Sequence, residues 1–100
     1  MTAIALNLKK VKASVVTLLL ELYDNRRLTL NRCLALVNKQ LNKIGWGTLN
    51  KSERLCVIIE LRHSGMFSGS RDGRLKLTES GRYSAAYIAR EYREYIASRN

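Results

Sequence analysis

The chain of 100 residues contains no proline, one histidine and two cysteines, and it has few acidic side chains. Its apolar runs are short, and none approaches the roughly 20 residues that a membrane-spanning helix requires. Cys33 and Cys56 fit no zinc-ligand spacing, and one histidine cannot complete a tetrahedral site with them. We therefore expect two free, buried thiols in a reducing cytoplasm, with no metal, no cofactor and no membrane as partner.

Residues that could form a catalytic site are also scarce. His63 has no cysteine or serine spaced to act as its partner, and the acidic residues are scattered without a clear acid–base pair. No glycine-rich motif that cradles phosphate is present. We therefore do not expect an enzyme, and we interpret His63 as a ring near the C-terminal end of a helix, where positive charge is favourable.

Positive charge, in contrast, is abundant. The chain carries 18 lysines and arginines against 8 aspartates and glutamates, a net charge of +10. Such an excess repels itself in a compact state, and its simplest explanation is a polyanionic partner. Lys9, Lys10 and Lys12 crowd the start of the first helical segment, where cations oppose the helix dipole. These three lysines either serve a positively charged surface or form an ordinary solvated face.

Apolar residues recur at helical spacing in four segments, and the first three end at asparagine or glycine. These segments are residues 8–24, 29–44, 50–64 and 79–98. The third opens with a capping box made by Asn50 and Glu53. We place Leu55, Ile58, Ile59 and either Leu61 or Arg62 on its apolar face. The only tryptophan, Trp46, is expected to pack over the joint between the second and third helices.

Residues 65–78 are typical of a β-hairpin. Met66 and Phe67 begin a first strand, a loop rich in glycine and serine follows, and residues 74–77 alternate polar and apolar as a half-buried strand does. Residues 2–6 could add a further small strand. The predicted fold is one domain over residues 1–100, mainly α with a small β-hairpin (α+β).

The order of helix, helix, turn, capped helix, hairpin and long helix resembles the winged helix-turn-helix of transcriptional regulators. The resemblance is strongest over residues 50–85 and is carried by two junctions. Ser64-Gly65-Met66-Phe67 leaves the third helix, and Leu77-Thr78-Glu79-Ser80-Gly81-Arg82 returns from the hairpin. MarR-like and PadR-like regulators have similar junctions. The resemblance implies a winged helix with an added C-terminal helix, in which residues 50–64 form the recognition helix and residues 65–78 the wing.

In such folds the recognition helix enters the major groove through its N-terminal half, and the wing reaches the minor groove or its phosphates. The start of the second helix also suits a phosphate, because its first amides are unpaired. Asn50 and Ser52 can instead cap the helix, Lys51 and Arg54 can contact phosphates or base edges, and the hairpin can be a solvated loop. The candidate DNA-binding residues are Thr29, Asn31, Arg32, Asn50, Lys51, Ser52, Arg54, Arg71, Arg74 and Lys76.

The final helix is rich in tyrosine, which suits an interface because it buries apolar surface and keeps a polar tip. We expect a homodimer, although the same side chains could fold back onto a monomer's core. The expected interface residues are Tyr83, Tyr87, Ile88, Tyr92, Tyr95 and Ile96.

The predicted function is sequence-dependent binding of double-stranded DNA by a dimeric transcriptional regulator, cytoplasmic and nucleoid-associated when bound. Its small size and the lack of an effector domain suggest an origin in a phage, a plasmid or another mobile element. The alternative is a protein-interaction module, an inhibitor or adaptor, that uses the tyrosine-rich helix. RNA is a third possible partner, but no aromatic platform for stacking bases is evident.

Overall fold

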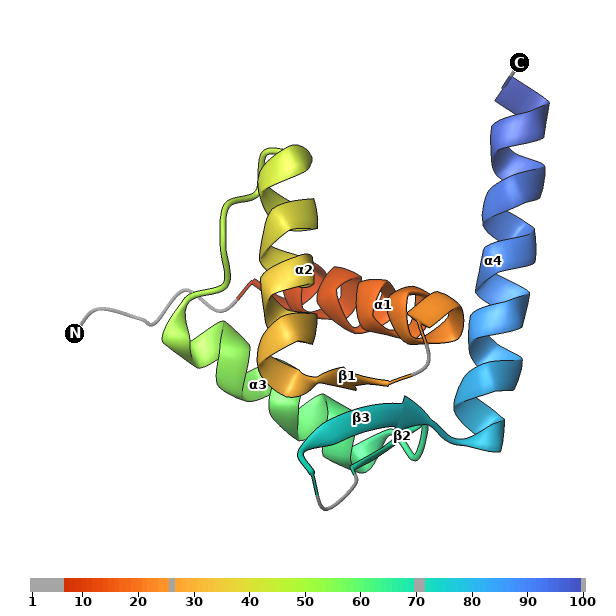
Figure 1. The fold of residues 1–100 in the computed structure, drawn as a ribbon. Coiled ribbons are helices and arrows are strands. Elements are labelled where there is room, and N and C mark those ends of the chain that lie inside the picture. Colours follow the sequence, from red (N-terminus) through yellow and green to blue (C-terminus); the bar gives the residue numbers. More distant parts are fainter. Residues whose placement is uncertain (1–6, 26, 70–71, 100) are drawn as a thin grey trace.

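The computed structural model describes residues 7–25, 27–69 and 72–99. It is mainly helical with a small three-stranded antiparallel sheet, so the expected α+β class is confirmed (Figure 1). The helices begin and end within one residue of the segments given by apolar spacing. The elements are α1 (Leu8–Asn25), β1 (Leu28–Thr29), α2 (Leu30–Lys43), α3 (Lys51–His63), β2 (Phe67–Gly69), β3 (Arg74–Leu77) and α4 (Glu79–Arg99).

The strand β1 was not predicted. It pairs antiparallel with β3, with Leu28 opposite Leu75 and Thr29 opposite Arg74, so the sheet order is β1-β3-β2. Two residues are too few to show the alternation that identifies a strand, and the pairing depends on a strand that lies far along the chain. The possible strand over residues 2–6 lies outside the described residues.

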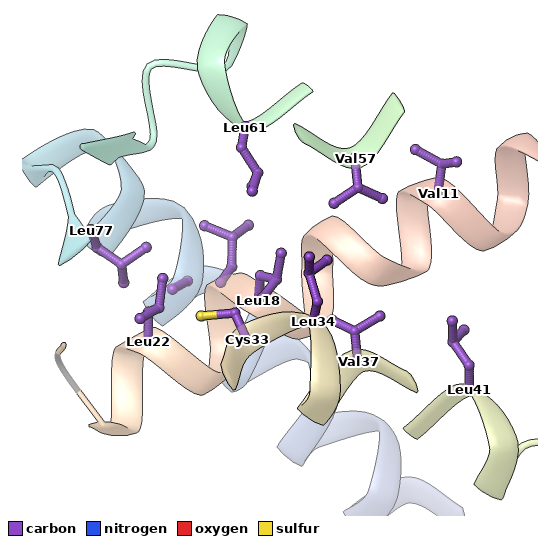
Figure 2. Close-up of a cluster of buried hydrophobic side chains, with 12 residues drawn as sticks. Val11, Leu18, Leu22, Cys33, Leu34, Val37, Leu41, Val57, Leu61 and Leu77 are labelled. Atoms are coloured by element: carbon purple, nitrogen blue, oxygen red, sulfur yellow. The ribbon is translucent and has the colours of Figure 1, made fainter. Parts of the chain in front are cut away.

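Helix α1 lies at the centre of the molecule and packs against α2, α3, α4 and β3. Apolar side chains from all of these elements meet in one cluster, and Figure 2 shows most of them turned toward a common space. Leu18 and Leu22 of α1 are almost fully buried. The cluster consists of Val11, Leu18, Leu19, Leu22, Cys33, Leu34, Val37, Leu41, Val57, Leu61, Leu77 and Ala85.

Helix α3 buries Leu61, one of the residues considered for its apolar face, but otherwise buries a different side from the predicted one. Its buried residues are Glu53, Val57 and Leu61, which follow one another at intervals of four and share one side of the helix. Leu55 and Ile59, expected on the apolar face, are 53% and 51% exposed. For Leu55 and Ile59 the prediction was wrong, because aliphatic character was used as the sign of burial and Glu53 was considered only as the capping-box partner.

A buried ion pair explains how Glu53 can lie inside. The Lys10 ammonium on α1 donates to Glu53 Oε1 at 3.0 Å and to the Thr48 carbonyl at 2.6 Å. The backbone amide of Asn50 donates to the same carboxylate oxygen at 2.9 Å. The side-chain oxygen Oδ1 of Asn50 accepts from the backbone amide of Glu53, which completes the predicted capping box. A buried charge is tolerated only when it is paired and hydrogen-bonded in this way.

This environment sets the pKa of the Glu53 carboxyl. Burial alone would raise that pKa, because it disfavours the charged form. Hydrogen bonds from the Asn50 amide and the Lys10 ammonium, together with the positive charge of Lys10, outweigh burial and hold the pKa below its usual range. Glu53 therefore remains ionised in the folded protein at neutral pH.

The two junctions that frame the hairpin are joined to each other. Thr78 Oγ1 donates to the Gly65 carbonyl at 2.6 Å, and the Thr78 amide donates to the Met66 carbonyl at 3.0 Å. Thr78 Oγ1 also accepts from the Gly81 amide in the first turn of α4. A side chain at Gly81 would collide with the Met66 backbone. The threonine and the glycine therefore fix α4 against the end of α3.

Trp46 does not pack as expected. It lies in the connection between α2 and α3 and is 45% exposed, beside Ile44, which is 47% exposed. The joint is closed instead by Asn38 of α2, whose Oδ1 accepts from the Leu49 amide at 2.9 Å. A polar side chain thus performs the role that was assigned to the tryptophan.

Candidate nucleic-acid interface

The outward face of α3 has cations at both ends and aliphatic side chains between them. Lys51, Leu55 and Ile59 follow at intervals of four residues, and Arg62 lies one turn beyond Ile59. All four side chains are exposed. We call this set (Lys51, Leu55, Ile59, Arg62) the outward row of α3. It lies on the side of the helix opposite the buried Val57.

The start of α2 lies beside the N-terminal half of α3. The Arg54 guanidinium donates to Asn31 Oδ1 at 3.4 Å, and both side chains are exposed. Thr29 caps α2, because its Oγ1 accepts from the Arg32 amide at 3.2 Å. The candidate residues form three groups: the start of α2, the N-terminal half of α3 and the hairpin. The contact between Asn31 and Arg54 joins the first two groups on one surface.

The hairpin adds the third group. Arg74 and Lys76 are exposed on β3 and alternate with Leu75 and the buried Leu77. Because Arg74 is the strand partner of Thr29, it lies next to the start of α2. The Arg74 guanidinium is 3.6 Å from the carboxylate of Asp72, in an exposed pair.

The hairpin and α3 border a common hollow of about 270 Å³. Ile58 and Arg62 line it on the helix side, and Gly69 and Gly73 line it on the hairpin side. The three groups therefore form one continuous region, which we call the cationic surface. Its exposed basic residues are Arg32, Lys51, Arg54, Arg62, Arg74 and Lys76.

The candidate residues from the sequence divide by their local roles. Thr29 and Asn50 use their side-chain oxygens as helix caps, and Ser52 is half-buried. Arg71 lies outside the described residues. Asn31 contacts Arg54, and the remaining candidates are exposed cations.

Leu55, Ile59 and Arg62 belong to the cationic surface but were not proposed from the sequence. Leu55 and Ile59 had been assigned to the core, since an aliphatic residue on a helix is normally buried. A capping-box glutamate four residues before Val57 was the available signal, because Glu53, Val57 and Leu61 form a continuous row. The sequence gives no sign that Glu53 forms an ion pair with Lys10, and this ion pair is what allows the row to be buried.

The lysines near the start of α1 do not act as one group. Lys10 is 8% exposed and is held in the ion pair with Glu53, so it has a structural role. Lys9 and Lys12 are exposed, and Lys12 lines an apolar hollow between α1 and α4. That hollow, of about 460 Å³, is lined mainly by aliphatic residues such as Val15 and Ile88.

The predicted interface residues of α4 fall on two faces. Ile88 is half-buried and packs on the core, while Tyr92, Tyr95 and Ile96 continue the same stripe and are 59%, 55% and 44% exposed. Figure 1 shows that α4 continues beyond α1, and Tyr92 still lines a hollow together with Leu20 of α1 and Gln40 of α2. Tyr83 and Tyr87 point away from this stripe; Tyr83 is 82% exposed, and the Arg90 guanidinium lies 5.6 Å from the centre of the Tyr87 ring.

The two cysteines differ in their surroundings. Cys33 is fully buried in the core, and burial raises the pKa of its thiol to about 11. Cys56 is half-buried on α3. Within the described residues, no three histidine, cysteine, aspartate or glutamate side chains come together as a metal site. Among the described helices, none combines the length and the apolar character needed to cross a bilayer.

Comparison of the chain with protein-family models, with curated proteins and with solved structures finds no match. The cationic surface is therefore the feature of this protein that bears on its function.

Proposed function

We propose that this protein binds double-stranded DNA as a winged helix-turn-helix regulator, with α3 in the major groove and the hairpin on the flanking backbone. The observation that carries the proposal is the continuity of the cationic surface. Contact between Asn31 and Arg54 joins α2 to α3, and pairing between Thr29 and Arg74 joins α2 to the hairpin. The order of elements also supports it, since a capped helix runs directly into a hairpin and then into a long helix.

The charge of this region suits a polyanion. Its six exposed cations come from three separate elements, α2, α3 and β3, and Asp72 is the acidic residue that accompanies them on the hairpin. Phosphate contacts of this kind supply much of the affinity for DNA and make it depend on salt. With 6–10 such contacts, affinity is expected to fall about 10³–10⁵-fold between 50 and 200 mM salt.

Fluorescence anisotropy with a labelled mixed-sequence duplex at increasing salt tests the proposal. The variant Lys51→Gln/Lys76→Gln removes two exposed cations from the cationic surface. It should reduce the slope of log affinity against log salt by about 2, because each phosphate contact contributes about 0.9. Both side chains are exposed, so the fold should be unaffected.

The matched control is Lys39→Gln/Lys43→Gln, which removes the same charge from exposed positions toward the far end of α2. This control should keep the wild-type slope. Equal slopes for the two variants would show that binding follows net charge alone. No binding by the wild type at low salt would end the proposal altogether.

Sequence dependence requires a separate measurement. Selection from a random duplex pool should enrich a shared motif if α3 reads base edges. If two copies bind together, the motif should occur twice, about one helical turn apart. A pool that shows no enrichment would reduce the function to unspecific backbone binding.

The exposed half of α4 supports a homodimer. Tyr92, Tyr95 and Ile96 continue a stripe that is buried further down the same helix, and aromatic side chains of this kind are enriched at interfaces. We propose that a second copy covers these three residues. Sedimentation velocity over a range of concentrations should show a dimer that Tyr95→Ser/Ile96→Ser abolishes.

The control for the dimer is Tyr83→Ser/Tyr87→Ser on the other face of α4, which should leave the mass unchanged. A wild type that is monomeric at all concentrations would instead favour the alternative function, a protein-interaction module in which α4 binds a different protein. Nuclease treatment of a host lysate before a pull-down separates such partners from those held through DNA.

A further inference from the structure

Two large aliphatic side chains lie exposed in the middle of the cationic surface. Leu55 is 53% exposed and Ile59 is 51% exposed, and they follow one another by one helical turn on the outward row of α3. Covering exposed aliphatic side chains with a partner lowers the free energy of the complex, because it removes apolar surface from water. The described residues leave about half of each of these two side chains exposed, although Val57 of the same helix is fully buried.

The cations at the two ends of the row limit what the partner can be. Lys51 and Arg62 are eleven residues apart, which corresponds to about 16 Å along the helix axis. The major groove of DNA is about 12 Å wide, and phosphates border it on both sides. Long basic side chains at the ends can therefore reach the two backbones while Leu55 and Ile59 face the floor of the groove.

The floor of the major groove has one apolar feature, the C5-methyl group of thymine. Aliphatic side chains complement this methyl group and offer no hydrogen bond to a base edge. We propose that Leu55 and Ile59 contact thymine methyl groups and give the protein a preference for A·T pairs at the centre of its site. This inference depends on the DNA-binding function proposed above and specifies how α3 reads sequence.

A second copy of the chain is a poorer partner for this row. Two outward rows packed face to face in opposite directions would bring Lys51 of each copy near the cation at the other end of its partner's row. Like charges placed together in this way cost free energy. A polyanion with apolar groups between its charged edges would pair with the cations at the ends of the row and cover the aliphatic residues between them.

The test uses two alternating duplexes, one of A·T pairs and one in which every thymine is replaced by deoxyuridine. The two differ only in the methyl groups. Wild-type protein should bind the thymine duplex more tightly, by about 4-fold for each methyl group buried. Affinity is measured by competition against the same labelled duplex.

The variant Leu55→Ala/Ile59→Ala should bind the two duplexes equally, while its slope of affinity against salt stays the same. Ile44→Ala is the matched control, because Ile44 is 47% exposed but lies beyond the end of α2. This control should keep the preference for thymine. Circular dichroism of each variant checks that the fold is unchanged.

Three results would overturn the inference. Equal binding of the two duplexes by the wild type, with the salt slope still dependent on Lys51 and Lys76, would remove methyl recognition and leave the proposed function standing. A preference for thymine that persists in Leu55→Ala/Ile59→Ala would place the recognition elsewhere. Binding to neither duplex would remove the proposed function as well, and would leave the exposed row of α3 to a protein partner.

Discussion

Helices α2 and α3 are neighbours of similar length, but they relate to the core in opposite ways. In α2 polarity follows burial at most positions: Leu34, Val37 and Leu41 are inside, and Lys39 and Lys43 are outside. In α3 a glutamate is inside, and Leu55 and Ile59 are outside. Polarity therefore agrees with burial along most of α2, whereas on α3 the two disagree on both the inner and the outer face.

The largest effect is expected at the buried glutamate of α3. Glu53→Ala leaves the Lys10 ammonium buried without its counter-charge and also removes the acceptor for the Asn50 amide. Breaking a buried pair from one side costs about 3–5 kcal/mol. Urea denaturation followed by circular dichroism measures this loss in the free energy of unfolding.

The double variant Lys10→Met/Glu53→Leu separates the charge from the shape. Replacing both partners of a buried pair with apolar residues is often neutral or stabilising. Most of the stability lost in Glu53→Ala should therefore return. If the single variant loses no more than a surface substitution, the burial of Glu53 is wrong, and the two helices do not differ in the way described.

The same substitution in the two helices tests the contrast most simply. Leu41 of α2 is 2% exposed, so Leu41→Ala should cost about 2–5 kcal/mol through lost burial and a cavity. Leu55 of α3 is 53% exposed, and Leu55→Ala should change the free energy of unfolding by no more than about 0.5 kcal/mol. Denaturant midpoints of the two variants, measured side by side, check both values.

Similar losses for Leu41→Ala and Leu55→Ala would mean that Leu55 supports the core. In that case the outward row of α3 would not be available to DNA. A small loss at Leu55 together with weaker DNA binding would separate its role in recognition from any role in folding.

Local signals were enough to predict α2 and the hairpin. Thr29 at the start of α2, Gly45 after its end and the alternation over residues 74–77 each act over a few residues, so the sequence displays them directly. The Thr78 and Gly81 pattern was also visible, although its reason, the approach of α4 to the Met66 backbone, was not.

Long-range pairing decided what the sequence could not show. The buried face of α3 depends on Lys10, which is 43 residues away from Glu53. Strand β1 exists through its pairing with β3, and the exposed Tyr95 and Ile96 lie on the part of α4 that extends beyond α1. Of the candidate site, exposed cations such as Lys51 and Lys76 were predicted, while Leu55 and Ile59 were missed because polarity was used in place of burial.

Lowering the pH should weaken the ion pair between Lys10 and Glu53 and reduce the free energy of unfolding, by less than Glu53→Ala does. The pKa of Glu53 is lower in the folded protein than in the unfolded chain, where it is about 4.3. A group of this kind contributes stability above its unfolded pKa, and the contribution is lost as pH falls through the folded pKa. Stability should therefore decline below about pH 5 in wild type and decline less steeply in Glu53→Gln.

Glu94→Gln is the control for the acid measurement, since Glu94 is exposed on α4 and its charge lies outside the buried pair. It should follow the wild-type curve of unfolding free energy against pH. A Glu53→Gln curve that is parallel to wild type across the acid range would show that ionisation of Glu53 contributes nothing to folding.

The cysteines extend the contrast between α2 and α3 to a measurement that leaves stability unchanged. Cys33 of α2 is fully buried with a thiol pKa of about 11, so only about one molecule in a thousand carries the reactive thiolate at pH 8. Cys56 of α3 is half-buried.

Iodoacetamide should therefore modify Cys56 first in the native protein, with mass spectrometry of peptides reporting each site. In urea both cysteines should react at similar rates, because unfolding removes the difference in surroundings. Equal rates in the native protein would show that the two thiols are equally accessible. The buried side of α2 would then shield Cys33 no better than α3 shields Cys56.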